Sequence, residues 1–571
     1  MVNARSRTLS VVILILLIVI LLAGCSSENI RSPKPRSDWS RGIRVGFAHG
    51  LTQPSMVVEA NGTVNIAWTV ETALNSGRIG YSKISPNGEF LIQSTISIPE
   101  SHLRGGTLRE GGQGLELCWV SDEGLRCSLI NDDDPAQINP YTLVSAPPDI
   151  HLFTSAGEHY AWVTRDGDLF ISVSGGEPTK LSTQAVNADV NLQGDQLLVA
   201  WTEAKNDSET TLWLTTMSEG NIGEAHQVSR ITAGVLAGLR QVGLGAAMVG
   251  DQYCLVYGYE FTRGLEGGSA STRLTCINMQ TWVPESEQRL ELVITEKPGY
   301  QTYSGPFAIS RLAQVEIPYS NFTYLPSSPI SLDGQTVIVV STPAQFRYKI
   351  RQDIAMVLFD NGRVIGYQPV TATSNSSLSP NLAGDADGNL YMAWLERSIG
   401  NEIFFATTNP QAAELLNQYD MSEVTVTILG IVVEAITGLL LLPFMLLAIG
   451  IAYIAVFVTS RVASLIRLER LKDLIGFISG AAVLWVVKLL FLPYIGSFVP
   501  FSTWLPEIPA SLLTAYKVFW PLLILSASLG FSHLIIKRKD IPSLTTRFGL
   551  YAVIDITLTA LIYGVMLQGA T

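Results

Sequence analysis

Apolar and polar positions follow two different patterns along this chain. Over residues 40–415, short runs of alternating apolar and polar residues are separated by turns rich in Gly, Asn and Asp, a pattern typical of β-strands. From about residue 424 onward, long apolar runs take their place. The pattern predicts a β-rich soluble part followed by an α-helical membrane part.

One unit recurs within the β-rich part: a tight turn, followed by a strand that ends on a large aromatic residue. Its clearest copy runs from Asp385 to Trp394. The first spacings between copies are 51, 43 and 39 residues, which indicates a β-propeller with about four strands in each blade. The aromatic markers of the copies are Trp68, Trp119, Trp162, Trp201, Tyr257 and Trp394.

A further, degenerate copy ends at Val340, so seven blades are favoured over six or eight. The interval from Tyr257 to Val340 is long, and its segment 300–329 is either a loop insertion or an eighth blade. Arg41–Phe47, which precedes the first copy, is expected to supply the outermost strand of the last blade. Such closure matters because an open ring would leave unpaired edge strands.

The recurring Pro-x-apolar, Asp/Asn-Gly, strand and Ala-Trp pattern resembles sialidase-like (BNR-type) propellers and the bacterial lipoproteins built on the same repeat. The resemblance covers residues 41–410 and implies the propeller fold. The sialidase Asp-box, Ser-x-Asp-x-Gly-x-x-x-Trp, is met only approximately, because Asp387 and Gly388 lie too far from Trp394 and the Ser is absent. We therefore assign no catalytic residue from this resemblance.

The N-terminus reads as an export signal. Arg5 and Arg7 precede an apolar run that ends in Leu22-Ala-Gly-Cys25. This tetrapeptide resembles the bacterial lipobox, which implies that residues 1–24 are a signal peptide and that Cys25 carries lipid, palmitate included. The alternative is an uncleaved signal-anchor helix with an incidental cysteine. Both alternatives place the following residues outside the cytoplasm, and residues 25–40 are predicted to be a tether.

The other four cysteines fall into two pairs. If Ser121–Gly124 is a tight turn, Cys118 opposes Cys127 across one hairpin, and Cys254 and Cys276 flank a longer loop in the same part of another blade. An even number of cysteines in an exported domain favours disulfide bonds. Free buried thiols are the alternative, and no His lies at the spacing of a metal ligand.

Residues 424–571 are predicted to form a membrane domain with four transmembrane helices, at about 437–459, 474–495, 512–536 and 548–568. Basic residues cluster after the first and the third of these spans, and the positive-inside rule places both clusters in the cytoplasm. The propeller and the C-terminus are then extracytoplasmic, at the cell membrane. The clustered residues are Arg461, Arg467, Arg470, Lys472, Lys537, Arg538, Lys539 and Arg547.

Charge excludes one class of partner. The chain has a net charge of −12, although the residues from Met421 onward carry +3. The soluble part is therefore acidic, which argues against nucleic acid, because phosphate binding needs clustered Lys and Arg.

Polar residues within or beside the apolar runs are costly and suggest a function. Glu434 and Lys488 are expected toward the outer side, where they could pair, whereas Asp555 has no evident partner. The simpler interpretation is that Lys488 extends to the interface and Glu434 lies there.

Other candidates for chemistry lie in the propeller. Glu71, Glu203 and Glu396 follow the markers and could act as glycosidase carboxylates, although blade packing is favoured. Asp132–Asp134 and the pair Asp385 and Asp387 could bind calcium, but turn formation is favoured, and no cofactor is assigned. An aromatic segment is either a recognition surface or a packed plug; it contains Tyr300, Tyr303, Phe307, Tyr319, Phe322 and Tyr324.

The sequence thus predicts a lipid-anchored propeller on a membrane domain, acting as a binding or scaffold subunit that holds a protein partner in the cell envelope. The competing hypothesis is a surface glycoside hydrolase of the sialidase type.

Overall fold

The computed structural model describes most of the chain between residues 35 and 563. The described residues are 35, 37–72, 77–98, 100, 103–122, 124–131, 134–144, 150–172, 176–193, 196–218, 221–233, 238–249, 252–263, 270–278, 280–284, 287–290, 292, 294, 299–314, 329–346, 349–360, 363–373, 375–397, 400–418, 442–468, 471–491, 510–539, 541 and 543–563. The chain divides into two compact units, a β unit within residues 29–418 and a helical unit that includes residues 419–571.

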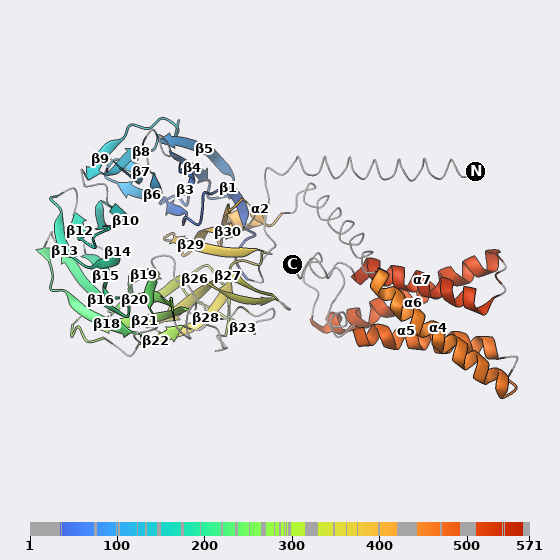
Figure 1. Ribbon diagram of the computed structural model, residues 1–571. Helices are drawn as coiled ribbons and strands as arrows, with labels where there is room; N and C mark the ends of the chain where they lie inside the picture. Colours follow the sequence, from blue (N-terminus) through green and yellow to red (C-terminus); the bar gives the residue numbers. More distant parts are fainter. Residues whose placement is uncertain are drawn as a thin grey trace. The chain divides into compact units, whose positions relative to one another are not determined.

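The β unit is a seven-bladed propeller, which confirms the favoured blade number. Its strands form seven antiparallel sheets, and Figure 1 shows these sheets following one another around a ring in chain order. The first three blades are β2 (Ser55–Val58), β3 (Val64–Thr72), β4 (Gly77–Ile84) and β5 (Phe90–Ile98); β6 (Arg104–Gly111), β7 (Gly114–Ser121), β8 (Gly124–Leu129) and β9 (Tyr141–Val144); and β10 (Ile150–Ala156), β11 (His159–Thr164), β12 (Leu169–Ser172) and β13 (Thr179–Ser182).

The next three blades have the same inner four-stranded plan. They are β14 (Ala185–Gln193), β15 (Gln196–Asn206), β16 (Glu209–Ser218), β17 (Asn221–Ile222) and β18 (His226–Thr232); β19 (Leu239–Val249), β20 (Gln252–Phe261), β21 (Ala270–Asn278) and β22 (Gln288–Leu290); and β25 (Ile330–Leu332), β26 (Gln335–Phe346), β27 (Lys349–Asp360) and β28 (Arg363–Pro369).

The aromatic segment does not form an eighth blade. Its described part contributes β23 (Tyr300–Thr302) and β24 (Arg311–Ala313), and β24 pairs with β28 on the outer edge of the sixth sheet. The long interval between markers is therefore an insertion that widens one blade.

The N-terminal strand closes the ring, as predicted. The seventh blade joins β29 (Ser376–Gly384), β30 (Leu390–Arg397) and β31 (Glu402–Thr407) to β1 (Ile43–Phe47), with Ile43 opposite Phe405. A short helix, α2 (Pro410–Leu416), follows this blade, and Asn409 caps its N-terminus by accepting from two backbone N–H groups.

The predicted tether extends too far. Trp39 has 0% of its surface exposed and lies in a core cluster with Phe307 and Leu312. The backbone N–H of Ser40 donates to the carbonyl of Thr407 at 2.8 Å. Residues 37–40 therefore belong to the fold, because one large indole outweighs the polar composition around it.

Both predicted disulfides form. Cys118 and Cys127 are cross-strand partners in the second blade, and Cys254 and Cys276 are partners in the fifth. The first pair confirms the register that the turn at Ser121–Gly124 predicts.

The helical unit contains α4 (Leu442–Leu465), α5 (Lys472–Phe491), α6 (Ala510–Lys539) and α7 (Leu544–Tyr563). In its described residues, three helices are long and apolar enough to cross a membrane, so the prediction of four spans is corrected to three. The predicted second span is α5, whose stretch between Asp473 and Lys488 is shorter than the ~20 apolar residues a bilayer needs. The qualifying segments are Leu446–Leu465, Phe519–Lys539 and Leu544–Tyr563.

Candidate functional site

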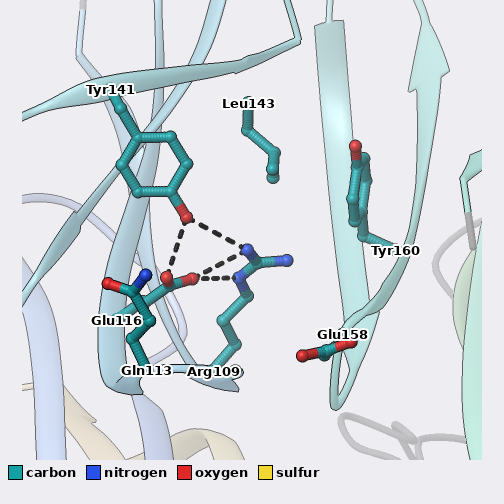
Figure 2. A pocket seen from close by; sticks show the side chains of 8 residues that line it. Arg109, Gln113, Glu116, Tyr141, Leu143, Glu158 and Tyr160 are labelled. Carbon is teal, nitrogen blue, oxygen red and sulfur yellow. Dashed lines mark hydrogen bonds and ion pairs between the residues drawn. The ribbon is translucent and has the colours of Figure 1, made fainter. Parts of the chain in front are cut away.

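A pocket of about 410 Å³ opens between the second and third blades, within the size range of ligand sites. Figure 2 shows Arg109, Glu116 and Tyr141 on the side of the second blade and Glu158 and Tyr160 on the side of the third. The lining is completed by Gly112, Gln113 and Leu143.

The hairpin between β6 and β7 positions the two charged residues of the second blade. Arg109 and Glu116 are register partners, so their side chains share one face of the sheet. The turn is rich in glycine for a steric reason. A β-carbon at Gly111 would lie 2.7 Å from each carboxylate oxygen of Glu116, and one at Gly112 would collide with Glu158. Two adjacent glycines therefore allow two carboxylates to approach the same turn.

Arg109, Glu116 and Tyr141 form a closed hydrogen-bond network. Nε and Nη2 of Arg109 each lie 2.7 Å from Oε2 of Glu116. The Tyr141 hydroxyl donates to Oε1 of Glu116 at 2.8 Å and accepts from Nη2 of Arg109 at 3.3 Å. Burial, and then the bond to Glu116, raise the pKa of Tyr141, which keeps the phenol protonated as a donor.

A stack of aromatic rings supports the opposite wall. Cζ of Arg109 lies 5.5 Å from the centre of the Tyr160 ring. Tyr160 stacks on Trp162 at 5.8 Å, and Trp162 stacks on Phe170 at 5.3 Å. The marker of the third blade thus fixes the orientation of a pocket residue.

The charges of the pocket favour a neutral ligand over an anion. Glu116 neutralises Arg109, and Glu158 adds a second carboxylate at the exposed rim. The three charged lining residues therefore sum to one negative charge, which would repel an anionic group.

The predicted markers are core residues. Trp68, Trp119, Trp162, Trp201, Tyr257 and Trp394 are each at most 5% exposed. Two of the proposed glycosidase carboxylates serve this packing: Glu203 accepts from the indole of Trp201 at 3.1 Å, and Glu396 accepts from that of Trp394 at 3.2 Å. Blade packing, the favoured interpretation, accounts for both. The side chain of Glu71 lies outside the described residues.

The aromatic segment is a packed plug where it is described. Phe307 is 3% exposed within the core, and Tyr300 and Tyr303 are partly buried against core clusters. Phe307 therefore offers no recognition surface, because the segment folds inward onto the sixth blade. Tyr319, Phe322 and Tyr324 lie outside the described residues.

The turn at Asp385 uses its carboxylate within the chain. Oδ1 accepts from the backbone N–H groups of Asp387 and Asn389, and Oδ2 accepts from the Tyr391 hydroxyl at 2.8 Å. Turn formation thus accounts for Asp385 without calcium. Of the other candidate, Asp132 and its neighbour at 133 lie outside the described residues.

Lys488 pairs with Asp555 inside the helical unit, whereas the sequence favoured a Lys488 that extends to the interface and offered Glu434 as a possible partner. The Lys488 ammonium contacts the Asp555 carboxylate and lies 3.3 Å from the Thr559 hydroxyl, while Ser528 donates to Asp555 at 3.4 Å. Glu434 and Cys25 lie outside the described residues, so the predicted lipidation stays a prediction.

Sequence reasoning missed the pocket itself. The available signal was the Gly111–Gly114 turn, whose register brings Arg109 opposite Glu116. The approach of the third blade, which supplies Glu158 and Tyr160, depends on ring geometry and leaves no local pattern. Glu116 also lies close to the sulfurs of Cys118 and Cys127, but these form a disulfide and are not thiolate ligands.

Fold and site together define a β-propeller with an inter-blade pocket, joined to a helical unit with membrane-spanning character. No family model and no curated protein matches the sequence. Similar solved structures include the N-terminal domain of Nup159, at 8% identity and TM-score 0.37, covering 66% of this chain and 96% of that one.

Two further similar structures are glycan-related enzymes. One is the Penicillium chrysogenum alpha-L-arabinanase complexed with arabinobiose, at 12% identity and TM-score 0.35, covering 66% of this chain and 98% of that one. The other is the Trypanosoma rangeli sialidase in complex with sialic acid, at 11% identity and TM-score 0.34, covering 68% and 58%.

Proposed function

We propose that this protein is a binding subunit of the cell envelope, which holds a protein partner on an extracytoplasmic propeller. The observation that carries the proposal is a disulfide-bridged propeller in the same chain as helices apolar enough to cross a membrane. Disulfides persist in oxidising compartments, so the propeller belongs outside the cytoplasm while the helices hold it at the membrane. Acylation of Cys25 adds a second anchor near the first strand.

The distribution of basic residues supports this orientation. Arg461 lies near the C-terminal end of α4 and Arg467 just beyond it, and Lys537–Lys539 end α6. If the C-terminal end of α4 faces the cytoplasm, the propeller, which precedes this helix in the chain, lies outside the cytoplasm. Lys488 of α5 is neutralised by Asp555, which lowers the cost of burying that charge within the helical unit.

Crosslinking in native membranes tests the binding function. A tagged full-length chain, treated with an amine-reactive crosslinker before solubilisation, should give one reproducible heteromeric product that contains the propeller. Repeated recovery of the chain alone would overturn the proposal. A propeller accessible to protease only from the cytoplasmic side would overturn the orientation.

Glycoside hydrolysis is the competing function. Asp353 and Glu396 have raised pKa values because they are buried, but each is only 2% exposed, so no carboxyl is assigned to catalysis. Under this hypothesis, purified full-length protein should cleave fluorogenic glycosides. No turnover by folded protein, with native near-UV circular dichroism, would leave binding as the function.

A further inference from the structure

We propose that the pocket between the second and third blades binds one neutral residue of an extended partner peptide, with an apolar side chain inserted between Tyr141 and Tyr160. This inference rests on the proposed binding function and assigns it a site. The occupant is identified from the polar groups the pocket leaves available and from the shape of its apolar walls.

The guanidinium of Arg109 has one hydrogen-bond donor that the described residues do not use. Its side chain is 7% exposed, and Nε and Nη2 are both used by Glu116. The third nitrogen, Nη1, is buried and has no hydrogen-bond partner among the described residues. Figure 2 shows Nη1 directed away from Glu116, toward the side of the pocket that carries Tyr160. A buried donor without an acceptor is costly, so a ligand carbonyl at this point gains more than it would at an exposed donor.

The rim supplies the complementary groups. Glu158 and Gln113 are exposed at the mouth of the pocket, where a carboxylate and an amide oxygen can accept from a ligand N–H. The pocket therefore offers one deep donor and acceptors at its entrance. One peptide residue presents the matching set, a carbonyl and an N–H on the same backbone unit.

The apolar walls of the pocket favour an apolar side chain on the bound peptide residue. Tyr141, Leu143 and Tyr160 surround the cavity with two phenol rings and a branched aliphatic group. An aromatic or branched apolar side chain would bury its surface there and stack on the rings. Tyr160 is held by its stack on Trp162, so the wall is formed before the ligand arrives, which reduces the ordering cost of binding.

Two other ligand classes fit less well. A sugar ring would bury more hydroxyl groups than the available polar groups of Arg109, Gln113 and Glu158 can satisfy, and unpaired buried hydroxyls are costly. An anion such as a free carboxylate would meet Glu116 and Glu158, and the lining carries one net negative charge.

A displayed library of random heptapeptides, panned against the full-length protein in nanodiscs, tests the site. Enriched peptides are then synthesised with blocked ends, and their binding is measured by fluorescence polarisation. We expect a consensus with one aromatic or branched apolar residue and no acidic neighbour. Arg109→Lys keeps a cation beside Glu116 but lacks the planar fork, and it should weaken binding by about 10-fold, as loss of a hydrogen bond to a charged group predicts.

Matched variants keep the test independent of folding. Glu158→Gln changes only an exposed rim residue and should weaken binding several-fold, whereas Leu91→Ala, at an exposed position on β5 of the first blade, should leave it unchanged. Peptides that bind Arg109→Lys and Glu158→Gln as tightly as the wild type would overturn the inference, and so would a library without enrichment. A glycan array that gives the only specific ligand would also overturn it. The crosslinking experiment in native membranes separates the two proposals. If a protein partner crosslinks but no pocket variant changes the binding affinity, the binding function stands and the partner binds at another site.

Discussion

Lys488 on α5 and Asp555 on α7 form a buried ion pair that joins two helices far apart in sequence. Asp555 is fully buried and Lys488 is largely so. Ser528 on α6 donates to the same carboxylate at 3.4 Å, so one charged centre connects three helices. The consequence is that neither charge can be removed alone without leaving the other unpaired.

Replacing one member of this ion pair should lower the stability of the helical unit more than replacing both. Lys488→Ala or Asp555→Ala should each lower the stability of the helical unit by about 3–5 kcal/mol, because the remaining charge stays buried without compensation. The double variant Lys488→Leu, Asp555→Leu should recover most of this loss. Thermal unfolding in detergent, followed by far-UV circular dichroism, measures the difference.

Thr557→Ala is the control for the ion pair. Among the described residues, the Thr557 hydroxyl bonds to the carbonyl of Val553 one turn earlier in α7, and its loss should change stability by about 0.5 kcal/mol or less. A double variant as unstable as the two single variants would show that the pair stabilises the helices beyond neutralising its own charges.

The indole of Trp39 should be required for a stable closed ring. Trp39→Ala removes a fully buried side chain from the core cluster that contains Phe307 and Trp394, and large-to-small changes of this kind cost about 3–5 kcal/mol. Chemical unfolding followed by near-UV circular dichroism measures the loss. Leu91→Ala on β5, where 54% of the side chain is exposed, should shift the midpoint little, and a Trp39→Ala shift no larger would contradict the structural role.

Sequence patterns predicted the features that depend on local register. Turn chemistry and strand alternation gave the blade unit, the pairing of Cys118 with Cys127, and ring closure by the N-terminal strand. Features that depend on the approach of distant elements were missed. The partner of Asp555 was missed for this reason, because the contact with Lys488 depends on how α5 and α7 approach each other, and that approach leaves no local sequence pattern.

The two disulfides should differ in the stability they contribute. Cys254 and Cys276 are 22 residues apart and Cys118 and Cys127 are 9 apart. Loop-closure entropy therefore predicts that changing either pair to Ala lowers the free energy of unfolding by roughly 3 kcal/mol. The decrease should be larger by about 0.7 kcal/mol for the fifth-blade pair, which closes the longer loop. Urea unfolding of the two double-alanine variants measures the order. The reverse order would show that packing around the sulfurs, and not chain entropy, sets their contribution.

Asp353 should make the propeller less stable as the pH rises toward neutrality. It is 2% exposed on β27, with Nε of Arg351 3.1 Å from its carboxylate. Burial raises its pKa to about 7 from an ordinary value of 3.8, against the opposing effect of Arg351. Between these two values the native state binds more protons than the unfolded state, so stability is highest below about pH 4 and falls as the pH passes through 7, by on the order of 1 kcal/mol per pH unit.

Asp353→Asn should remove this slope and raise the melting temperature at pH 8 relative to the wild type, because an amide has no proton to lose. Asp387→Asn is the matched control, since Asp387 is exposed in the turn before β30, and its pH profile should parallel that of the wild type. Melting temperatures from pH 4 to pH 8, read by near-UV circular dichroism, give the comparison. Parallel profiles for Asp353→Asn and the wild type would show that Arg351 keeps the carboxyl ionised throughout. Any loss of stability with rising pH would then come from another buried acid such as Glu396, whose pKa burial also raises.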